Sequence, residues 1–165
     1  GRLPEPMREV LPMERGERVL AHAPTRGGSY VVATSTALYL PVARAEGETE
    51  LRFLRLPWDR IGHASWKDGW LHVHEPNGAA DHHVRLTEPG SMPETVRERV
   101  TATVVMDQQS RLPSGERVRI VGRRPVEGTE LRWSFVFEAG LDSDDPGLRD
   151  QAERLLEDLR RQTGL

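Results

Sequence analysis

Seven short segments rich in apolar and β-branched residues recur between residues 17 and 86, and turn-forming residues separate them. The segments expected as strands lie at 18–21, 30–34, 37–40, 51–56, 63–66, 70–75 and 82–86. The Pro and Gly residues within 24–28 and the Asp68-Gly69 pair are typical of turns between antiparallel strands. Strands at a spacing of roughly 8–12 residues favour a β-sandwich or a small barrel.

A helix is expected after this run, over residues 93–108. Ser91 and Glu94 have the spacing of a capping box, in which two side chains satisfy backbone N–H groups at a helix start. Val96, Val100 and Val104 follow at intervals of four residues, which places them on one helical face. The run 100–105 is also rich in β-branched residues, which favour strands, but the cap and the stripe agree on a helix.

The C-terminal part of the sequence predicts a β-hairpin followed by an amphipathic helix. Apolar residues alternate with polar ones in both hairpin strands, which indicates one buried and one solvated face. These apolar residues are Val118, Ile120, Leu131, Trp133, Phe135 and Phe137. Asp145 and Pro146 are typical of a helix start and Gly164 of a helix end. We therefore expect an N-terminal arm at 1–16, a barrel with its helix at 17–108, and a hairpin and helix at 109–165 that pack on the same domain.

Composition excludes several classes of site. The 165 residues include no cysteine, which rules out thiol catalysis, cysteine-ligated zinc and disulfides. The longest apolar run, residues 37–43, is far shorter than the roughly 20 residues of a membrane-spanning helix. The formal net charge of −3 argues against a dedicated nucleic-acid binder. No phosphate loop, dinucleotide-binding glycine motif or nucleophile elbow occurs, so no enzyme class is indicated.

Two segments resemble parts of bacterial pleckstrin-homology-like (PH-like) domains. In residues 31–40, VVATSTALYL, a threonine-containing turn joins two apolar strands, and residues 56–61, LPWDRI, are similar to the start of the fifth strand in those domains. The resemblance covers roughly residues 17–108. It implies an α+β fold, mainly antiparallel β, in which a seven-strand PH-like barrel is capped by a helix. The Arg-rich, Lys-poor composition is similar to that of actinobacterial proteins. Such domains act mostly as binding or assembly modules, so the resemblance implies a fold more than a chemistry.

Three histidines are expected to share an exposed face of one hairpin. His72 and His74 lie two residues apart on one strand, so their side chains point to the same side. Pairing of Val73 with Val84 would place His74 opposite His83, with Cβ atoms about 4.5–5.5 Å apart. Imidazole is a good ligand for zinc, nickel and copper, so His72, His74 and His83 are the candidate metal ligands. Because a zinc site needs about four ligands, the three histidines also fit an exposed polar face without metal, or a surface that takes up adventitious nickel during purification. Without metal, the clustered imidazoles would form a pH-sensitive patch.

Arginines are concentrated in the expected C-terminal hairpin. Arg117, Arg119 and Arg123 are expected on the solvated face of one strand and Arg132 on its partner, which makes them the candidate partner-binding residues. Glutamates of the same hairpin would pair with them in a salt-bridged surface. The other interpretations are a face for an acidic protein partner and a basic ribbon that enters a nucleic-acid groove.

The function expected from these features is that of a non-enzymatic, soluble, cytoplasmic protein-binding or assembly module without a cofactor. The expected partner is a protein, with a second copy of the chain as one candidate, and no membrane is involved. Two alternatives stay open. One is a metal-binding protein or metal-dependent enzyme that uses the histidine cluster. The other is a nucleic-acid-associated protein that uses the arginine-rich hairpin, which the near-neutral overall charge disfavours.

Overall fold

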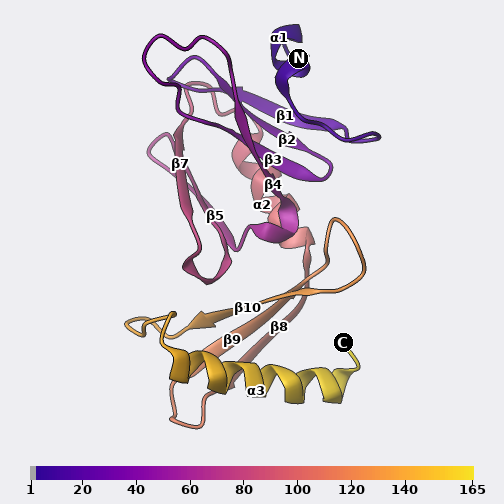
Figure 1. Cartoon of the computed structure of the whole chain (residues 1–165), viewed down its shortest axis with the longest axis vertical. Coiled ribbons are helices and arrows are strands. Elements are labelled where there is room, and N and C mark those ends of the chain that lie inside the picture. Colours follow the sequence, from indigo (N-terminus) through magenta and orange to yellow (C-terminus); the bar gives the residue numbers. More distant parts are fainter. Residues whose placement is uncertain (1–2) are drawn as a thin grey trace.

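The computed structural model describes residues 3–165, and its strands form three antiparallel sheets (Figure 1). Residues 1–2 of the expected arm lie outside the described part. The strand orders are β1-β2-β3-β4, β5-β6-β7 and β10-β9-β8. The expected α+β class with mainly antiparallel sheets is therefore confirmed. No helix among residues 3–165 is both long and apolar enough to cross a membrane.

The first two sheets contain the seven strands expected from the sequence. Their bounds are β1 Val19–Pro24, β2 Tyr30–Thr34, β3 Ala37–Pro41, β4 Phe53–Pro57, β5 His63–Lys67, β6 Trp70–His74 and β7 Asp81–Arg85. The two sheets and the helix α2 (Met92–Ala102) share one core, to which inward-facing side chains such as Leu38, Leu71 and Val96 contribute. We call residues 3–102, which include these elements, the upper unit.

The two sheets do not close into the expected barrel. Thr25 and Leu86 form one isolated bridge just beyond the ends of β1 and β7, but these two strands do not pair with each other, and β4 does not pair with β5. Pro57 ends β4 and has no N–H to donate, and the 3-10 turn η1 (Trp58–Arg60) then carries the chain to the second sheet. The seven strands occur in the expected order and a helix follows them, but the strands form two separate sheets.

The expected helix over 93–108 is wrong in its second half. α2 ends at Ala102, and residues Val104–Arg111 form the strand β8, which pairs with β9 (Arg117–Arg123). The β-branched residues Val104 and Val105 begin this strand, so local strand preference and pairing with β9 together outweigh the helical stripe. Ser91 does occupy the N-cap position, but its side chain makes no capping hydrogen bond.

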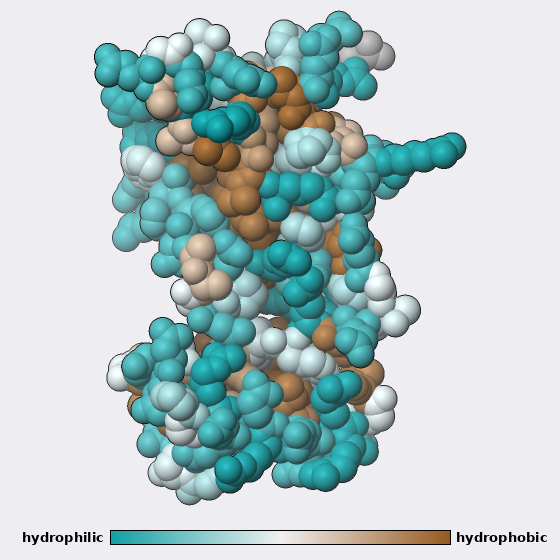
Figure 2. Space-filling model, viewed as in Figure 1, coloured by the Kyte–Doolittle hydropathy of each residue, from teal (hydrophilic) through white to brown (hydrophobic). Residues whose placement is uncertain are grey.

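The third sheet and the C-terminal helix form a lower unit, residues 104–165 (Figure 1). The expected hairpin is confirmed as β9 and β10 (Arg132–Phe137), and β8 adds a third strand, so the expected boundary between residues 108 and 109 falls inside β8. The helix α3 (Pro146–Thr163) has Asp145 as its N-cap, as expected, and the carboxylate of Asp145 accepts the Gly147 N–H at 2.8 Å. The apolar side of α3 packs on Ile120 and Phe135. Figure 2 shows the mostly hydrophilic outer surface of this unit, with apolar atoms along the line between sheet and helix.

The N-terminal arm covers the outer face of the first sheet. The helix α1 (Glu5–Val10) and its flanks place Leu3, Met7 and Leu11 against Val32 and Tyr39. β2 and β3 are therefore buried on both faces, which explains why their sequences are apolar almost throughout instead of alternating.

The buried carboxylate of Glu17 holds the end of the N-terminal arm against the first sheet. The side chain of Glu17 is 1% exposed and accepts hydrogen bonds from the hydroxyls of Thr34 and Tyr39, the latter at 2.7 Å. Burial by itself would raise the pKa of Glu17, but the backbone N–H of Glu14, these two hydroxyls and the charge of Arg55 lower it overall. Burial and the hydrogen bond to Glu17 raise the pKa of Tyr39 to about 12.

The upper and lower units are joined by a buried arginine. Arg123 of β9 is 6% exposed, and its guanidinium donates to the carbonyls of Val100 and Gly62 at 3.0 and 2.9 Å and to the hydroxyl of Thr103 at 2.9 Å. These acceptors lie at the end of α2 and just before β5. Burial lowers the pKa of Arg123 below its ordinary value. One side chain thus holds the third sheet against two elements of the upper unit.

Replacing this buried donor tests its contribution to stability. Arg123→Gln leaves some of the three acceptors unpaired, so we expect the free energy of unfolding to fall by about 3 kcal/mol. Urea denaturation measures the change. The matched control is Arg124→Gln, because Arg124 is exposed. Equal stability of the two variants would contradict the role assigned to Arg123.

The Glu17 network predicts a pH dependence of stability. A lowered pKa in the folded state stabilises the fold above the ordinary value of 4.5, and this contribution is lost as the pH falls through the folded-state pKa. Glu17→Gln should therefore lower the free energy of unfolding at pH 7 by roughly 1–3 kcal/mol, and the deficit should shrink on acidification. Urea denaturation as a function of pH measures it, with the exposed Glu9→Gln as control. A deficit that is constant with pH would be the contrary result.

Candidate functional site

Histidines gather on one face of the second sheet, as predicted, but in a different register. Leu71 rather than Val73 pairs with Val84, and His72 therefore lies opposite His83. The predicted pairing is wrong by two residues, and a shift of two keeps each side chain on its predicted face. The turn η2 (Pro76–Gly78) sets this register, because it lets β7 begin earlier than the expected residue 82.

The observed register adds two members to the cluster, His63 and Asp81. The two Nδ1 atoms of His72 and His83 lie 2.6 Å apart, so one ring donates a hydrogen bond to the other. Nδ1 of His74 lies 2.6 Å from a carboxylate oxygen of Asp81, and the ring of His63 stacks on that of His74 with centroids 5.8 Å apart. The hydrogen bond with His74 lowers the pKa of Asp81.

These side chains do not converge on one point. Among residues 3–165, no three His, Asp or Glu side chains are arranged so that they could hold one metal ion. The Nδ1 atoms of His72 and His83 are directed at each other, and Nδ1 of His74 at Asp81, so one ring nitrogen of each predicted ligand already has a partner within the protein. Metal binding by His72, His74 and His83 stays a prediction.

The four predicted partner-binding arginines lie in three different environments. Arg117 and Arg119 are exposed on the face of the lower sheet that is turned away from α3, where they pair with Glu138 at 2.9 Å and Asp107 at 3.3 Å. Arg123 is buried at the joint between the units, so it does not belong to the solvated face on which it was expected. Arg132 pairs at 2.5 Å with the carboxylate of Asp59, which is 3% exposed.

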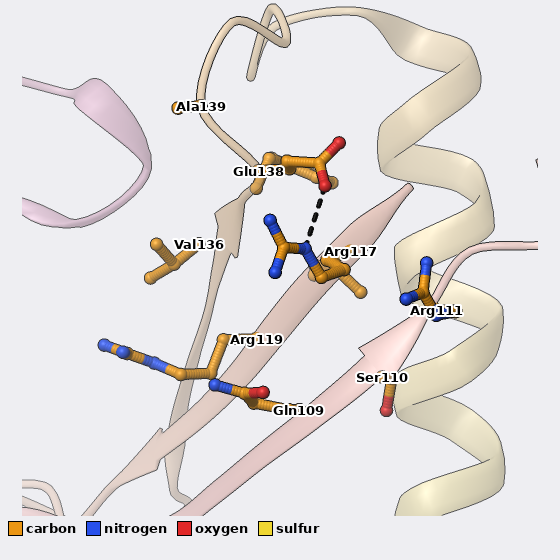
Figure 3. Close-up of a pocket in the computed structure, with 10 residues that line it drawn as sticks. Gln109, Ser110, Arg111, Arg117, Arg119, Val136, Glu138 and Ala139 are labelled. Carbon is orange, nitrogen blue, oxygen red and sulfur yellow. Dashed lines mark hydrogen bonds and ion pairs between the residues drawn. The ribbon is translucent and has the colours of Figure 1, made fainter. Parts of the chain in front are cut away.

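A groove of about 500 Å³ crosses the open part of this face (Figure 3). In Figure 3 the side chains of Arg117, Arg119 and Val136 extend on the side of the sheet away from α3. All three strands of the lower sheet contribute, and the groove is lined by Gln109, Ser110, Arg111, Arg117, Val118, Arg119, Val136, Phe137, Glu138 and Ala139. The other end of the same face carries Val121 and Ser134, which are buried.

Sequence reasoning missed the β8 side of this groove. Asp107 lies in the predicted helix and Gln109 directly after it, so the sequence pattern does not place either residue beside the arginines of the hairpin. The β-branched run 100–105 was the signal that could have placed them on a strand. Val136 was expected on the solvated face, and it is 49% exposed.

Comparison of this chain with known protein families, with curated proteins and with solved structures finds no match. The resemblance to PH-like domains therefore stays a prediction, and the arguments about function depend on the geometry of the chain itself.

The histidine face leads to a prediction about metal. Because no three donors converge on it, we expect less than one zinc per chain after incubation with zinc and gel filtration of protein prepared without a nickel resin. Elemental analysis measures the ratio. Near-stoichiometric zinc that disappears in His83→Ala but persists in His22→Ala would contradict this expectation and would support the metal-binding alternative.

Proposed function

We propose that this chain is a non-enzymatic protein-binding module, and that the groove on the lower sheet binds an extended, acidic segment of a partner protein. The observation that carries the proposal is the open face of the sheet β10-β9-β8, where three arginines and the exposed apolar side chain of Val136 line one groove. The upper unit packs on the other end of the face, where Val121, Arg123 and Ser134 are buried, so the end with Arg117 and Arg119 is the more open one.

The charges of the groove favour an acidic occupant. Arg111, Arg117 and Arg119 line it, against Glu138 as the only carboxylate of the lining. The ion pairs that Arg117 and Arg119 form within the chain are solvent-exposed, and such pairs contribute only about 0–1 kcal/mol each. Carboxylates of a partner can therefore replace them at little cost.

The exposed apolar side chain of Val136 favours an extended segment. Val136 lies on β10, lines the groove and is 49% exposed, whereas Phe137 packs into the core beneath α3. Successive side chains of an extended segment point in opposite directions, so acidic and apolar residues that alternate present one kind to each side. A segment that lies across the strands can then place apolar side chains on Val136 and carboxylates on either margin.

Nucleic acid fits this surface less well. The groove has no exposed aromatic ring on which a base could stack, because Phe137 belongs to the core beneath α3. It also contains Glu138, and Asp107 lies close by on Arg119. Both carboxylates repel phosphates.

A labelled peptide that alternates Glu and Val tests the proposal by fluorescence anisotropy. We expect saturable binding that weakens with salt, and roughly three- to tenfold weaker binding to Arg117→Glu and to Arg119→Glu. Arg154→Glu on the exposed side of α3 is the matched control and should leave the affinity unchanged. A peptide that alternates Lys and Val should not bind.

Three results would contradict the proposal. They are equal affinity for the acidic and the basic peptide, unchanged affinity in both groove variants, and preferential binding of a single-stranded RNA of the same length. Light scattering of the free chain tests whether a second copy of the chain occupies the groove. A dimer that Arg117→Glu dissociates would place a second copy there instead of a different protein.

A further inference from the structure

A second basic cavity lies in the upper unit, where three connecting segments meet. The β1–β2 turn, the β3–β4 loop and the end of β7 surround a cavity of about 480 Å³. The bridge between Thr25 and Leu86 and a 3.0 Å hydrogen bond from the Arg26 N–H to the Arg85 carbonyl hold the turn against β7. The volume lies within the range of small-molecule sites, about 300–1,000 Å³.

Three arginines line this cavity, and no Asp or Glu side chain does. Arg26, Arg44 and Arg85 form no ion pair with any carboxylate of residues 3–165. This sets the cavity apart from the groove of the lower sheet, where Arg117 and Arg119 both have acidic partners. Three guanidinium groups that face one cavity without a carboxylate attract an anion.

Two of the guanidinium groups are held in place by neutral groups. Arg44 donates to the carbonyls of Gly27 and Thr49 at 3.0 and 3.3 Å, which fixes it across the β1–β2 turn. Arg85 lies over the ring of Trp70, with its Cζ atom 5.9 Å from the ring centroid. Positive charge is therefore in position before a ligand arrives, which reduces the entropy lost on binding.

An unpartnered hydroxyl is the second and independent sign of a ligand. Ser29 lines the cavity and is 6% exposed, and its Oγ has no hydrogen-bond partner. Its backbone N–H is satisfied by the hydroxyl of Thr25 at 3.0 Å, so the turn itself does not use the Ser29 side chain. A buried hydroxyl without a partner costs free energy, and an oxygen of a bound anion would remove that cost.

The remaining wall is apolar and is supplied by Val42, Leu51 and Val84. We propose that the cavity binds a phosphate monoester that carries an apolar group, with the phosphate on Arg26, Arg44, Arg85 and the Ser29 hydroxyl and the apolar group against this wall. A phosphate monoester carries about −1.5 to −2 charges at neutral pH and has three acceptor oxygens, which suits several guanidinium groups and one hydroxyl.

Calorimetric titration of the full chain with phenyl phosphate tests the site. We expect saturable one-to-one binding, and an affinity at least about tenfold lower in Arg44→Gln and in Arg26→Gln. The matched control is Arg52→Gln, because Arg52 belongs to the same β3–β4 loop but pairs with Glu48 and does not line the cavity. Benzoate, with one charge and a planar head, should bind more weakly than phenyl phosphate.

Ser29→Ala separates binding from folding. Removal of an unpartnered buried hydroxyl should leave the melting temperature of the free chain unchanged or higher, while the affinity for phenyl phosphate falls. If the melting temperature falls and the affinity does not, the hydroxyl is structural and the proposal is wrong at this residue.

Two sources of the same phosphate monoester can be distinguished. Sedimentation with phosphatidylcholine vesicles, with and without phosphatidic acid, tests a lipid headgroup, and phenyl phosphate tests a soluble compound. Binding of both that depends on Arg44 supports a lipid source, and binding of phenyl phosphate alone supports a soluble one. Absence of saturable phenyl phosphate binding, or binding that Arg26→Gln and Arg44→Gln leave unchanged, would overturn the proposal. Each of these results is independent of whether the groove on the lower sheet binds an acidic segment.

Discussion

The buried guanidinium of Arg123 holds the two halves of this protein in their relative positions. It reaches three acceptors that are distant in sequence, on Gly62, Val100 and Thr103. Burial of a charge is costly unless hydrogen bonds replace its water, so these acceptors are needed for this arrangement of the two units. The ion pair between Arg132 and the buried Asp59 adds a second contact between the same units.

This joint determines which part of the lower sheet is open. One end of the face carries Val121, Arg123 and Ser134, which are buried, and the other end carries Arg117 and Arg119, which are exposed. The packing of the upper unit on one end therefore gives different exposure to the two ends of a face whose alternation pattern is uniform.

The sequence predicted those elements that local patterns specify. The strand positions follow from turn residues, and the start of α3 follows from Asp145, whose carboxylate caps the helix. Strand β8 was missed because Val96, Val100 and Val104 continue a helical spacing across the end of α2, and only pairing with β9 makes the later residues a strand.

The other features of the candidate sites depend on tertiary contacts, which the sequence pattern alone does not predict. Arg123 has the same parity as Arg117 on β9, so alternation alone gives both the same exposure, and the packing of the upper unit separates them. The register of β6 and β7 depends on the turn η2, which moved Asp81 next to His74. Arg26, Arg44 and Arg85 come from segments far apart in the chain, and no spacing rule brings them together.

The most direct test of the central claim, that the open end of the lower sheet is the partner-binding surface, is an NMR titration of the isotope-labelled full chain with the acidic peptide. Amide shifts should concentrate in residues 109–119 and 136–139, and those of the histidine face and of α3 should stay in place. Shifts that centre on the second sheet or on the exposed side of α3, or no saturable shifts at all, would contradict it.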